Sequence, residues 1–249
     1  ASKVTNVETI NILDNGDAAF TATLLSSGKD ATITTGAYAT ALTIDASALD
    51  AASADDNADG VIDNTDASAE ILTFDGSSAT AALTITGGAA GDTITGGTGA
   101  DTINSGAGND TITMGANLTA ADTIDGGDGT DTLNVTSVSA ATLAGVTNVE
   151  TLAVTGASTV SLSSDLAFAT IDVSNASAQT LTFATGYTAA TTVALKSAVS
   201  TDVITNSADL AMTVDATSAD AITATMTITG DATTLNDAII MTAGAPTVG

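Results

Sequence analysis

A tandem glycine-aspartate repeat limits most narrowly the folds that are open to this chain. Between positions 86 and 134 the pattern Gly-Gly-x-Gly-x-Asp-x-U-x recurs, where U is an aliphatic residue, with one interruption at Met114 to Ala121. The copies that begin at Gly96 and Gly126 match at every position. Three others lack one glycine or the whole glycine turn. A short fixed period favours a solenoid, in which each repeat packs on its neighbours.

Short alternating runs fill the rest of the chain. Thr alternates with Ile, Leu or Val in stretches such as Phe20 to Leu25 and Thr151 to Val154, and Gly, Ser, Asn or Asp separates the stretches. Such alternation fits strands with one buried face, and no sustained helical spacing of apolar residues occurs. We therefore predict an all-β fold, a parallel β-solenoid or β-roll of stacked short strands. Its segments are a solenoid at 1–86 with a loop inserted at 55–66, a glycine-rich roll at 87–135, and a second solenoid at 136–249.

The charge balance excludes several classes of function. The chain has 29 Asp and Glu against 3 Lys and no Arg, for a net charge of -26, and it has no His, Cys or Trp. The missing His and Cys exclude typical zinc sites, disulfides and the usual nucleophilic triads, so we expect no enzyme. With only three basic side chains we expect no nucleic-acid partner. No apolar run in the sequence is long enough to span a membrane. Many carboxylates suit hard cations such as calcium.

The spacing of the repeat aspartates predicts two edges of calcium-binding turns. Two nonapeptides make one coil, so aspartates 18 residues apart share an edge, and the interruption stretches this spacing to 21. Glycines permit turns in which carbonyl oxygens converge, and we expect two or three calcium ions. One edge should carry Asp92, Asp110 and Asp131, and the other Asp101 and Asp122. The turn glycines assigned to these sites are Gly88, Gly97, Gly99, Gly106, Gly108, Gly127 and Gly129.

A second calcium loop is predicted between Asp55 and Asp66. It fits the twelve-residue EF-hand pattern, with Gly60 at the sharp turn, and its final Asp resembles dockerin-type loops, where EF-hand sensors have Glu. The predicted ligands are Asp55, Asn57, Asp59, the carbonyl of Val61, Asp63 and Asp66.

The glycine block resembles the RTX calcium-binding β-roll, over about a fifth of the chain. The sequences around it, at Ile44 to Ala48, Leu72 to Phe74 and Gly145 to Leu152, are similar to calcium-dependent bacterial surface-layer (S-layer) proteins. This resemblance implies export in an unfolded state by type I secretion, folding on external calcium, and self-association into a lattice at the cell surface. It also implies attachment to cell-surface polysaccharide through regions outside this sequence.

Two other functions remain open. The chain could be a repeat segment of a large RTX adhesin, or the non-catalytic roll of a secreted enzyme. The segment Val4 to Ile10 returns 142 residues later as Val146 to Leu152, which argues against the enzyme because such rolls usually form one block. This recurrence also leads us to expect a piece of a longer array, with a similar glycine block before Ala1.

Overall fold

The computed structural model shows the all-β solenoid that the sequence predicts. Each element in the described part of the chain is a β-strand, and neighbouring strands pair in parallel. The predicted loop from Asp55 to Asp66 lies outside the described residues. The structure describes residues 9–12, 19–25, 31–36, 40–49, 70–156, 159–163, 166–173, 180–183, 191–194, 203–206, 212–216, 225–226 and 239–243.

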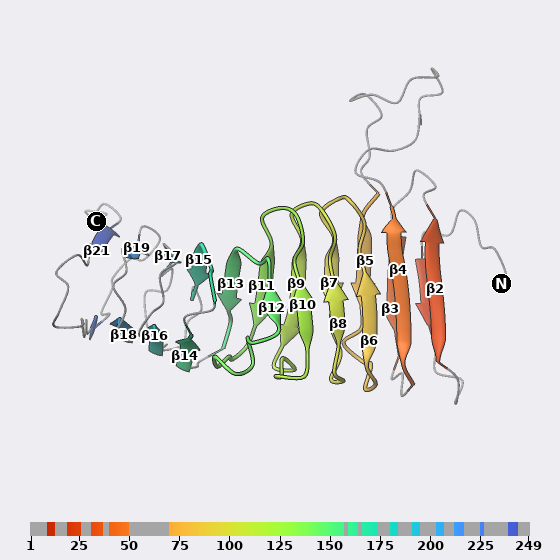
Figure 1. The fold of residues 1–249 in the computed structure, drawn as a ribbon, viewed down its shortest axis with the longest axis horizontal. Coiled ribbons are helices and arrows are strands. Elements are labelled where there is room, and N and C mark those ends of the chain that lie inside the picture. Colours follow the sequence, from red (N-terminus) through yellow and green to blue (C-terminus); the bar gives the residue numbers. More distant parts are fainter. Residues whose placement is uncertain are drawn as a thin grey trace, which may run out of the picture. The chain divides into compact units, whose positions relative to one another are not determined.

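The chain divides into two compact units, one of residues 1–132 with 145–148 and the other of 133–144 with 149–249. In the first unit, successive strands alternate between two parallel sheets, so each coil adds one strand to each sheet (Figure 1). One sheet holds, in spatial order, β1 (Thr9–Ile12), β3 (Ala31–Thr35), β5 (Leu72–Asp75), β7 (Thr93–Thr95) and β9 (Thr111–Gly115). The other holds β12 (Val146–Thr147), β10 (Thr123–Asp125), β8 (Thr102–Asn104), β6 (Leu83–Thr86), β4 (Leu42–Ala48) and β2 (Phe20–Leu25).

The second unit repeats this alternation, and its sequence holds no copy of the nonapeptide pattern after Asn134. Its strand β11 begins at Thr132, the residue that ends the main segment of the first unit. One sheet holds β11 (Thr132–Val135), β13 (Thr151–Val154), β15 (Thr170–Asp172), β17 (Thr191–Ala194), β19 (Met212–Ala216) and β21 (Ile239–Ala243). The other holds β14 (Thr159–Leu162), β16 (Thr180–Phe183), β18 (Val203–Asn206) and β20 (Thr225–Met226).

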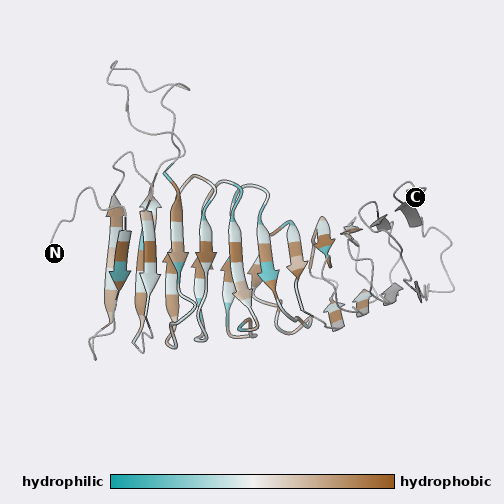
Figure 2. Ribbon diagram, turned by 180° about the vertical axis from the view of Figure 1, so that it is seen from behind, coloured by the Kyte–Doolittle hydropathy of each residue, from teal (hydrophilic) through white to brown (hydrophobic). Residues whose placement is uncertain are grey.

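The core of the first unit is a thin stack of aliphatic side chains. In one sheet Phe74 pairs with Ile94, and Ile94 with Ile112, and all three are at most 1% exposed. Their chain neighbours, which are threonines apart from Asp75, point outward, as the period of two requires. Figure 2 shows the resulting hydrophobic bands at the same height on neighbouring strands of this unit. Side chains of the sizes of Ile and Leu fill the narrow space between the sheets, which explains the scarcity of aromatic residues.

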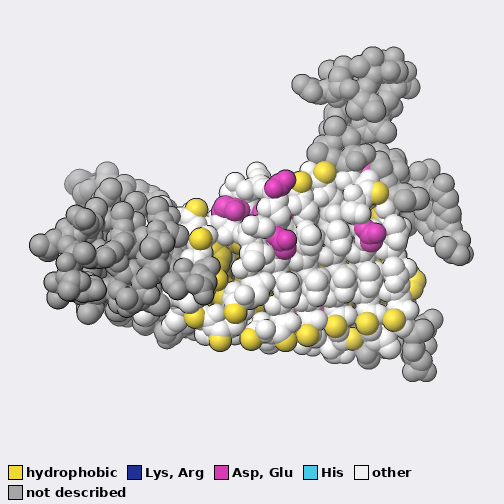
Figure 3. All heavy atoms as spheres, in the orientation of Figure 1, with side chains coloured by type: hydrophobic (Ala, Val, Ile, Leu, Met, Phe, Trp, Pro, Cys, Tyr) yellow, Lys and Arg dark blue, Asp and Glu magenta, His cyan; other side chains and the backbone are white. Residues whose placement is uncertain are grey.

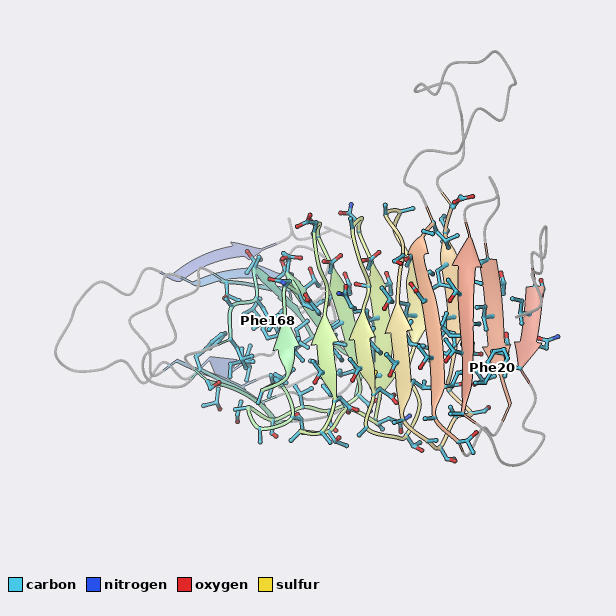
Figure 4. All side chains as sticks on the ribbon, turned by 45° about the vertical axis from the view of Figure 1, so that its right-hand side comes forward. Phe20 and Phe168 are labelled. Carbon is cyan, nitrogen blue, oxygen red and sulfur yellow. The ribbon has the colours of Figure 1, made fainter. Side chains whose placement is uncertain are left out.

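Phe20 is the exposed large hydrophobic residue of the described part, at 43%. It begins β2, the outermost strand of its sheet, and no further described strand covers it (Figure 4). Phe168 of the second unit, also labelled there, is buried. As for membrane crossing, no helix of sufficient length and apolarity occurs among the described residues.

The predicted segments 1–86, 87–135 and 136–249 follow sequence character and stay a prediction. In the structure, most of the glycine block belongs to the same compact unit as the strands before it.

Candidate metal site

The repeat aspartates of the first unit line two edges of the solenoid, as their spacing predicts. The first edge, uppermost in Figure 1, carries turns 87–92, 105–110 and 126–131, and the second edge carries turn 96–101 and loop 116–122. On the first edge the N–H of Asp92 donates to Oδ1 of Asp110 over 2.7 Å, and the N–H of Asp110 donates to Oδ1 of Asp131 over 2.8 Å. On the second edge the N–H of Asp101 donates to Oδ1 of Asp122 over 2.7 Å. Each carboxylate therefore joins its own coil to the preceding one.

These aspartates point into the solenoid and are almost completely buried, at no more than 2% exposure each. In the part of the chain that the structure describes, no Lys or Arg occurs that could neutralise them. Figure 3 agrees, since its described surface shows no basic side chain and only a few acidic ones. Buried carboxylates without a counter-charge are costly, because burial removes the water that solvates them. The site therefore favours protons or cations.

Burial raises the pKa of three of these carboxyl groups, because it disfavours the charged form. It raises the pKa of Asp92, although hydrogen bonds from the backbone N–H groups of Gly88 and Leu72 lower it in part. It raises the pKa of Asp101 as well. Hydrogen bonds from the N–H groups of Leu83 and Gly97 lower this pKa in part, and the charge of Asp122 raises it further. For Asp110, burial raises the pKa to about 6, while the Asp92 N–H and the Ser105 hydroxyl act in the opposite direction and the Asp92 charge adds to the rise. The roll therefore holds carboxylates that lack adequate solvation.

The glycine turns fall into two kinds, which we call closed and open. In the closed turns, 87–92 and 96–101, a glycine N–H donates to the aspartate of the same turn: Gly88 to Asp92 Oδ2 over 2.7 Å, and Gly97 to Asp101 Oδ2 over 2.9 Å. With Oδ1 bonded to the preceding coil, through the N–H of Leu72 or Leu83, both oxygens of each closed turn's carboxylate accept hydrogen bonds.

In the open turns, 105–110 and 126–131, the corresponding N–H turns away from the aspartate. Gly106 donates to Oδ1 of Asn104, and Gly127 to Oδ1 of Asp125, both over 3.1 Å. The glycines take positive φ, at 104° and 116° for Gly106 and Gly108 and at 86° and 150° for Gly127 and Gly129. In turn 105–110, Oδ2 of Asp110 is buried and accepts no hydrogen bond.

Main-chain oxygens crowd around the open turns. A methyl group on Gly106 would overlap the carbonyl of Gly88, and one on Gly127 the carbonyl of Gly106. The turns are tied together where the N–H of Asp128 donates to the Gly106 carbonyl over 3.0 Å. On the second edge, Gly97 and Gly99 lie against the backbone carbonyls of Ala79 and Ala81, outside any glycine turn. Stacked glycine turns therefore occur on the first edge alone among the described residues.

Asp122 is held by a local cap in place of a glycine turn. Its Oδ2 accepts the N–H of Thr119 over 2.7 Å and the Thr119 hydroxyl over 3.1 Å. The interrupted copy has thus replaced a glycine N–H by a threonine, and Leu118 in the same loop is buried. This loop satisfies its own carboxylate.

The first edge fits a hard cation. Calcium takes six to eight oxygen ligands from carboxylates, carbonyls and water. No three acidic side chains of the described residues converge closely enough to hold an ion by themselves, so main-chain oxygens must contribute. The buried, unbonded Oδ2 of Asp110 and the crowded carbonyls beside it are such a donor set. Asp110, Asp131 and the main chain of the two open turns would hold the ion.

Sequence reasoning missed Asn104 and Asp125, which lie just before the open turns. It also missed Asn148, whose left-handed backbone (φ 50°) lets its amide donate to Oδ1 of Asp125 over 2.8 Å. The available signal was an Asn or Asp as the last residue of a strand, directly before Gly or Ser. The ligands predicted in the 55–66 loop, Asp55, Asn57, Asp59, Val61, Asp63 and Asp66, lie outside the described residues, and their role stays a prediction.

Comparison with known families agrees with this geometry. A family described as the RTX calcium-binding nonapeptide repeat matches residues 84–116 and 119–136, about a fifth of the chain. No curated protein and no solved structure gives a significant match. The chain therefore carries RTX calcium-binding repeats, and calcium is the cation that they bind.

Proposed function

We propose that this chain is a structural part of a bacterial surface layer, secreted unfolded and folded outside the cell by calcium. The observation that carries the proposal is the continuity of the calcium roll with ordinary coils. Thr73 of β5 pairs with Thr93 of β7, and Thr93 with Thr111 of β9, so one parallel sheet passes without a change of register from apolar coils into glycine coils. An ion that fixes the glycine coils thereby also supports the apolar coils that continue the same sheet.

Calcium supplies the condition for folding in this proposal. The chain has a net charge of -26, and the roll buries aspartates that only cations or protons can neutralise. Calcium sites of extracellular modules bind in the range of about 0.1–1 mM. Such sites stay empty inside a cell and fill outside it, so the chain remains unfolded for type I export and folds at the surface. Proteins with RTX repeats are typically secreted.

The proposal gives the chain no catalytic role. Its acidic residues bind calcium or cap turns, and the absence of His, Cys and Arg from the sequence leaves few groups for acid-base or nucleophilic chemistry. Its main partner is another copy of itself, joined in a calcium-dependent lattice. Attachment to the cell is assigned to polysaccharide bound by other regions, with neither nucleic acid nor a membrane span involved.

A repeat segment of a large RTX adhesin is the second candidate. The stacking of coils favours it too, because a solenoid rod can hold a binding domain away from the cell. The two functions differ in whether copies of the chain associate side by side.

Electron microscopy of the purified chain, with calcium added and then removed by a chelator, tests the proposal. Ordered sheets or filaments that appear with calcium support the surface layer, and extended monomers support the adhesin. Circular dichroism on the same samples tests the shared part of both. An identical β signal and melting temperature with calcium and with chelator would remove calcium-dependent folding from the proposal.

A further inference from the structure

Agreement with the nonapeptide pattern does not decide which turns open. Turn 96–101 belongs to a copy that matches at every position, yet it is closed by the bond from Gly97 to Asp101. Turn 105–110 begins with Ser in place of the first Gly, yet it is open. Something other than the number of glycines must therefore set the state of each turn.

The residue directly before the turn separates the two kinds. Thr86 and Thr95 precede the closed turns, and Asn104 and Asp125 precede the open ones. An Asn or Asp side chain readily accepts the N–H two residues ahead of it, which forms an Asx turn. Here that N–H belongs to Gly106 or Gly127, the counterparts of the glycines that serve the aspartate carboxylates in the closed turns.

The competition for one N–H has a direct consequence for the metal site. Once Asn104 takes the N–H of Gly106, Oδ2 of Asp110 remains buried without a hydrogen bond. The neighbouring Ser105 hydroxyl, which lowers the pKa of Asp110, donates to the Gly126 carbonyl over 2.7 Å and not to this oxygen. A cation is then the partner that this oxygen lacks. In turn 96–101, the N–H of Gly97 already serves the corresponding oxygen of Asp101.

We propose that Asn104 and Asp125 select the turns that bind calcium. They hold turns 105–110 and 126–131 open on the first edge, so that Asp110 and Asp131 ligate calcium, whereas Asp101 in its closed turn on the second edge is a structural hydrogen-bond acceptor. The inference rests on the calcium-dependent folding proposed above and adds a rule for the distribution of the ions. Asn104 and Asp125 are positioning residues, since they act through the glycine N–H.

The first experiment compares two isosteric changes in the full chain, Asp110→Asn and Asp101→Asn, by calorimetric calcium titration and thermal melting. Asp110→Asn keeps the acceptor for the Asp92 N–H but loses the oxygen left for the ion. We expect calcium affinity to fall about tenfold or more, or one ion to be lost. In Asp101→Asn the side-chain amide N–H faces the Gly97 N–H, so two donors meet and a hydrogen bond is lost. We therefore expect a lower melting temperature, with a calcium affinity within about twofold of the parent.

An equal loss of calcium affinity in the two variants overturns the proposal. So does a failure of both to fold at saturating calcium, since Asp101 would then be as necessary to the calcium-loaded state as Asp110. If the parent chain folds equally well in chelator, the proposed function fails first, and that outcome is visible before any variant is measured.

The second experiment tests the selecting residues. Asp125→Thr and Asn104→Thr place at the strand end the residue type found before the closed turns, and we expect each to weaken calcium binding about tenfold. Asp125→Asn keeps the side-chain acceptor and should bind calcium like the parent. The matched control is Asp75→Thr, because Asp75 accepts the N–H of Ser77 over 3.0 Å in the same kind of turn, outside the glycine block. It removes the same charge and the same cap as Asp125→Thr and should leave calcium affinity unchanged.

Parent-like calcium affinity in both Asn104→Thr and Asp125→Thr would refute the selection rule. An equal loss in Asp75→Thr and Asp125→Thr would refute it as well, because the effect would then come from net charge or general stability.

Discussion

The coils before the glycine block and the coils within it place different residues at the same inward position. On the first edge this position is Ala31, then Leu72, and after them Asp92, as the pairing of Ala31 with Leu72 and of Thr73 with Thr93 shows. On the second edge Leu42 pairs with Leu83, and Asp101 follows at the same position. The backbone is continuous through the exchange, because the N–H groups of Leu72 and Leu83 donate to the first aspartates.

The replacement of apolar residues by Asp makes the folding of the glycine coils depend on bound ions. A buried leucine stabilises a coil by roughly 1.5–3 kcal/mol in any buffer. A buried carboxylate without a counter-ion costs several kcal/mol, which a bound cation offsets. The apolar coils should therefore hold their structure by packing alone, whereas the glycine coils should hold theirs only when calcium is present.

Calcium removal should have the largest effect on the difference in stability between the glycine coils and the apolar coils. In chelator we expect the backbone amides of Ile94, Ile103 and Ile112 in the glycine coils to lose protection from hydrogen exchange by orders of magnitude, because their coils lose the ions that neutralise the aspartates. The amides of Ile33 and Ile44, in the apolar coils, should keep more of their protection. Mass spectrometry of exchanged peptides can follow both sets in one sample, and a uniform loss over all of these strands would show that the two regions unfold as one.

Transfer of an aspartate into an apolar coil should have the next largest effect. In Leu83→Asp a carboxylate takes an inward position that is 1% exposed in the parent, next to a turn without stacked glycines, and we expect the free energy of unfolding to fall by about 3–5 kcal/mol even with calcium. Thr84→Asp, one residue along on the outward face, is the control and should cost less than about 1 kcal/mol. Urea titration at saturating calcium measures both, and similar losses would mean that burial is not what separates the two regions.

The response to pH should differ in sign with and without calcium. Burial raises the pKa of Asp110 to about 6, above the ordinary value of 3.8 that it has in an unfolded chain, so in chelator the folded state binds more protons than the unfolded state between these values. Residual folded structure should therefore gain stability as the pH falls from 7 toward 4. At saturating calcium, protons compete with the ion, and stability should fall over the same range. Melting temperatures at pH 7, 6 and 5 test this, and the same slope in both buffers would count against Asp110 as a ligand.

Much of this fold could be predicted because period and spacing are local in the sequence. Alternation placed Ile94 and Ile112 inside and their threonine neighbours outside, and the 18-residue spacing brought Asp92 beside Asp110. These features depend only on which face a residue occupies and on how many residues make a coil. The calcium-binding character of the block follows from the same pattern.

The state of each turn was not predictable in the same way. Whether Gly97 donates to Asp101, or Gly106 to Asn104, depends on two acceptors competing for one N–H at the end of a strand. The nonapeptide pattern leaves the strand-end position unspecified, so a complete match can close and an imperfect one can open. The cap of Asp122 by Thr119 was likewise hidden, because it arises within the interruption of the repeat.

Restoring the missing glycine of turn 87–92 should have the smallest effect. It separates the influence of the number of glycines from that of the strand-end residue. Ala90 stands where the pattern has Gly, it is buried, and it has no positive φ. We expect Ala90→Gly to lower stability by about 0.5–1 kcal/mol, because glycine adds freedom to the unfolded chain, while calcium affinity stays unchanged. The reason is that Thr86 still leaves the N–H of Gly88 to Asp92, so the turn remains closed. Calorimetric titration and melting of this variant measure both quantities. An increase in affinity or in the number of bound ions would show that the glycine count, and not the strand-end residue, separates the turns that bind calcium from those that do not.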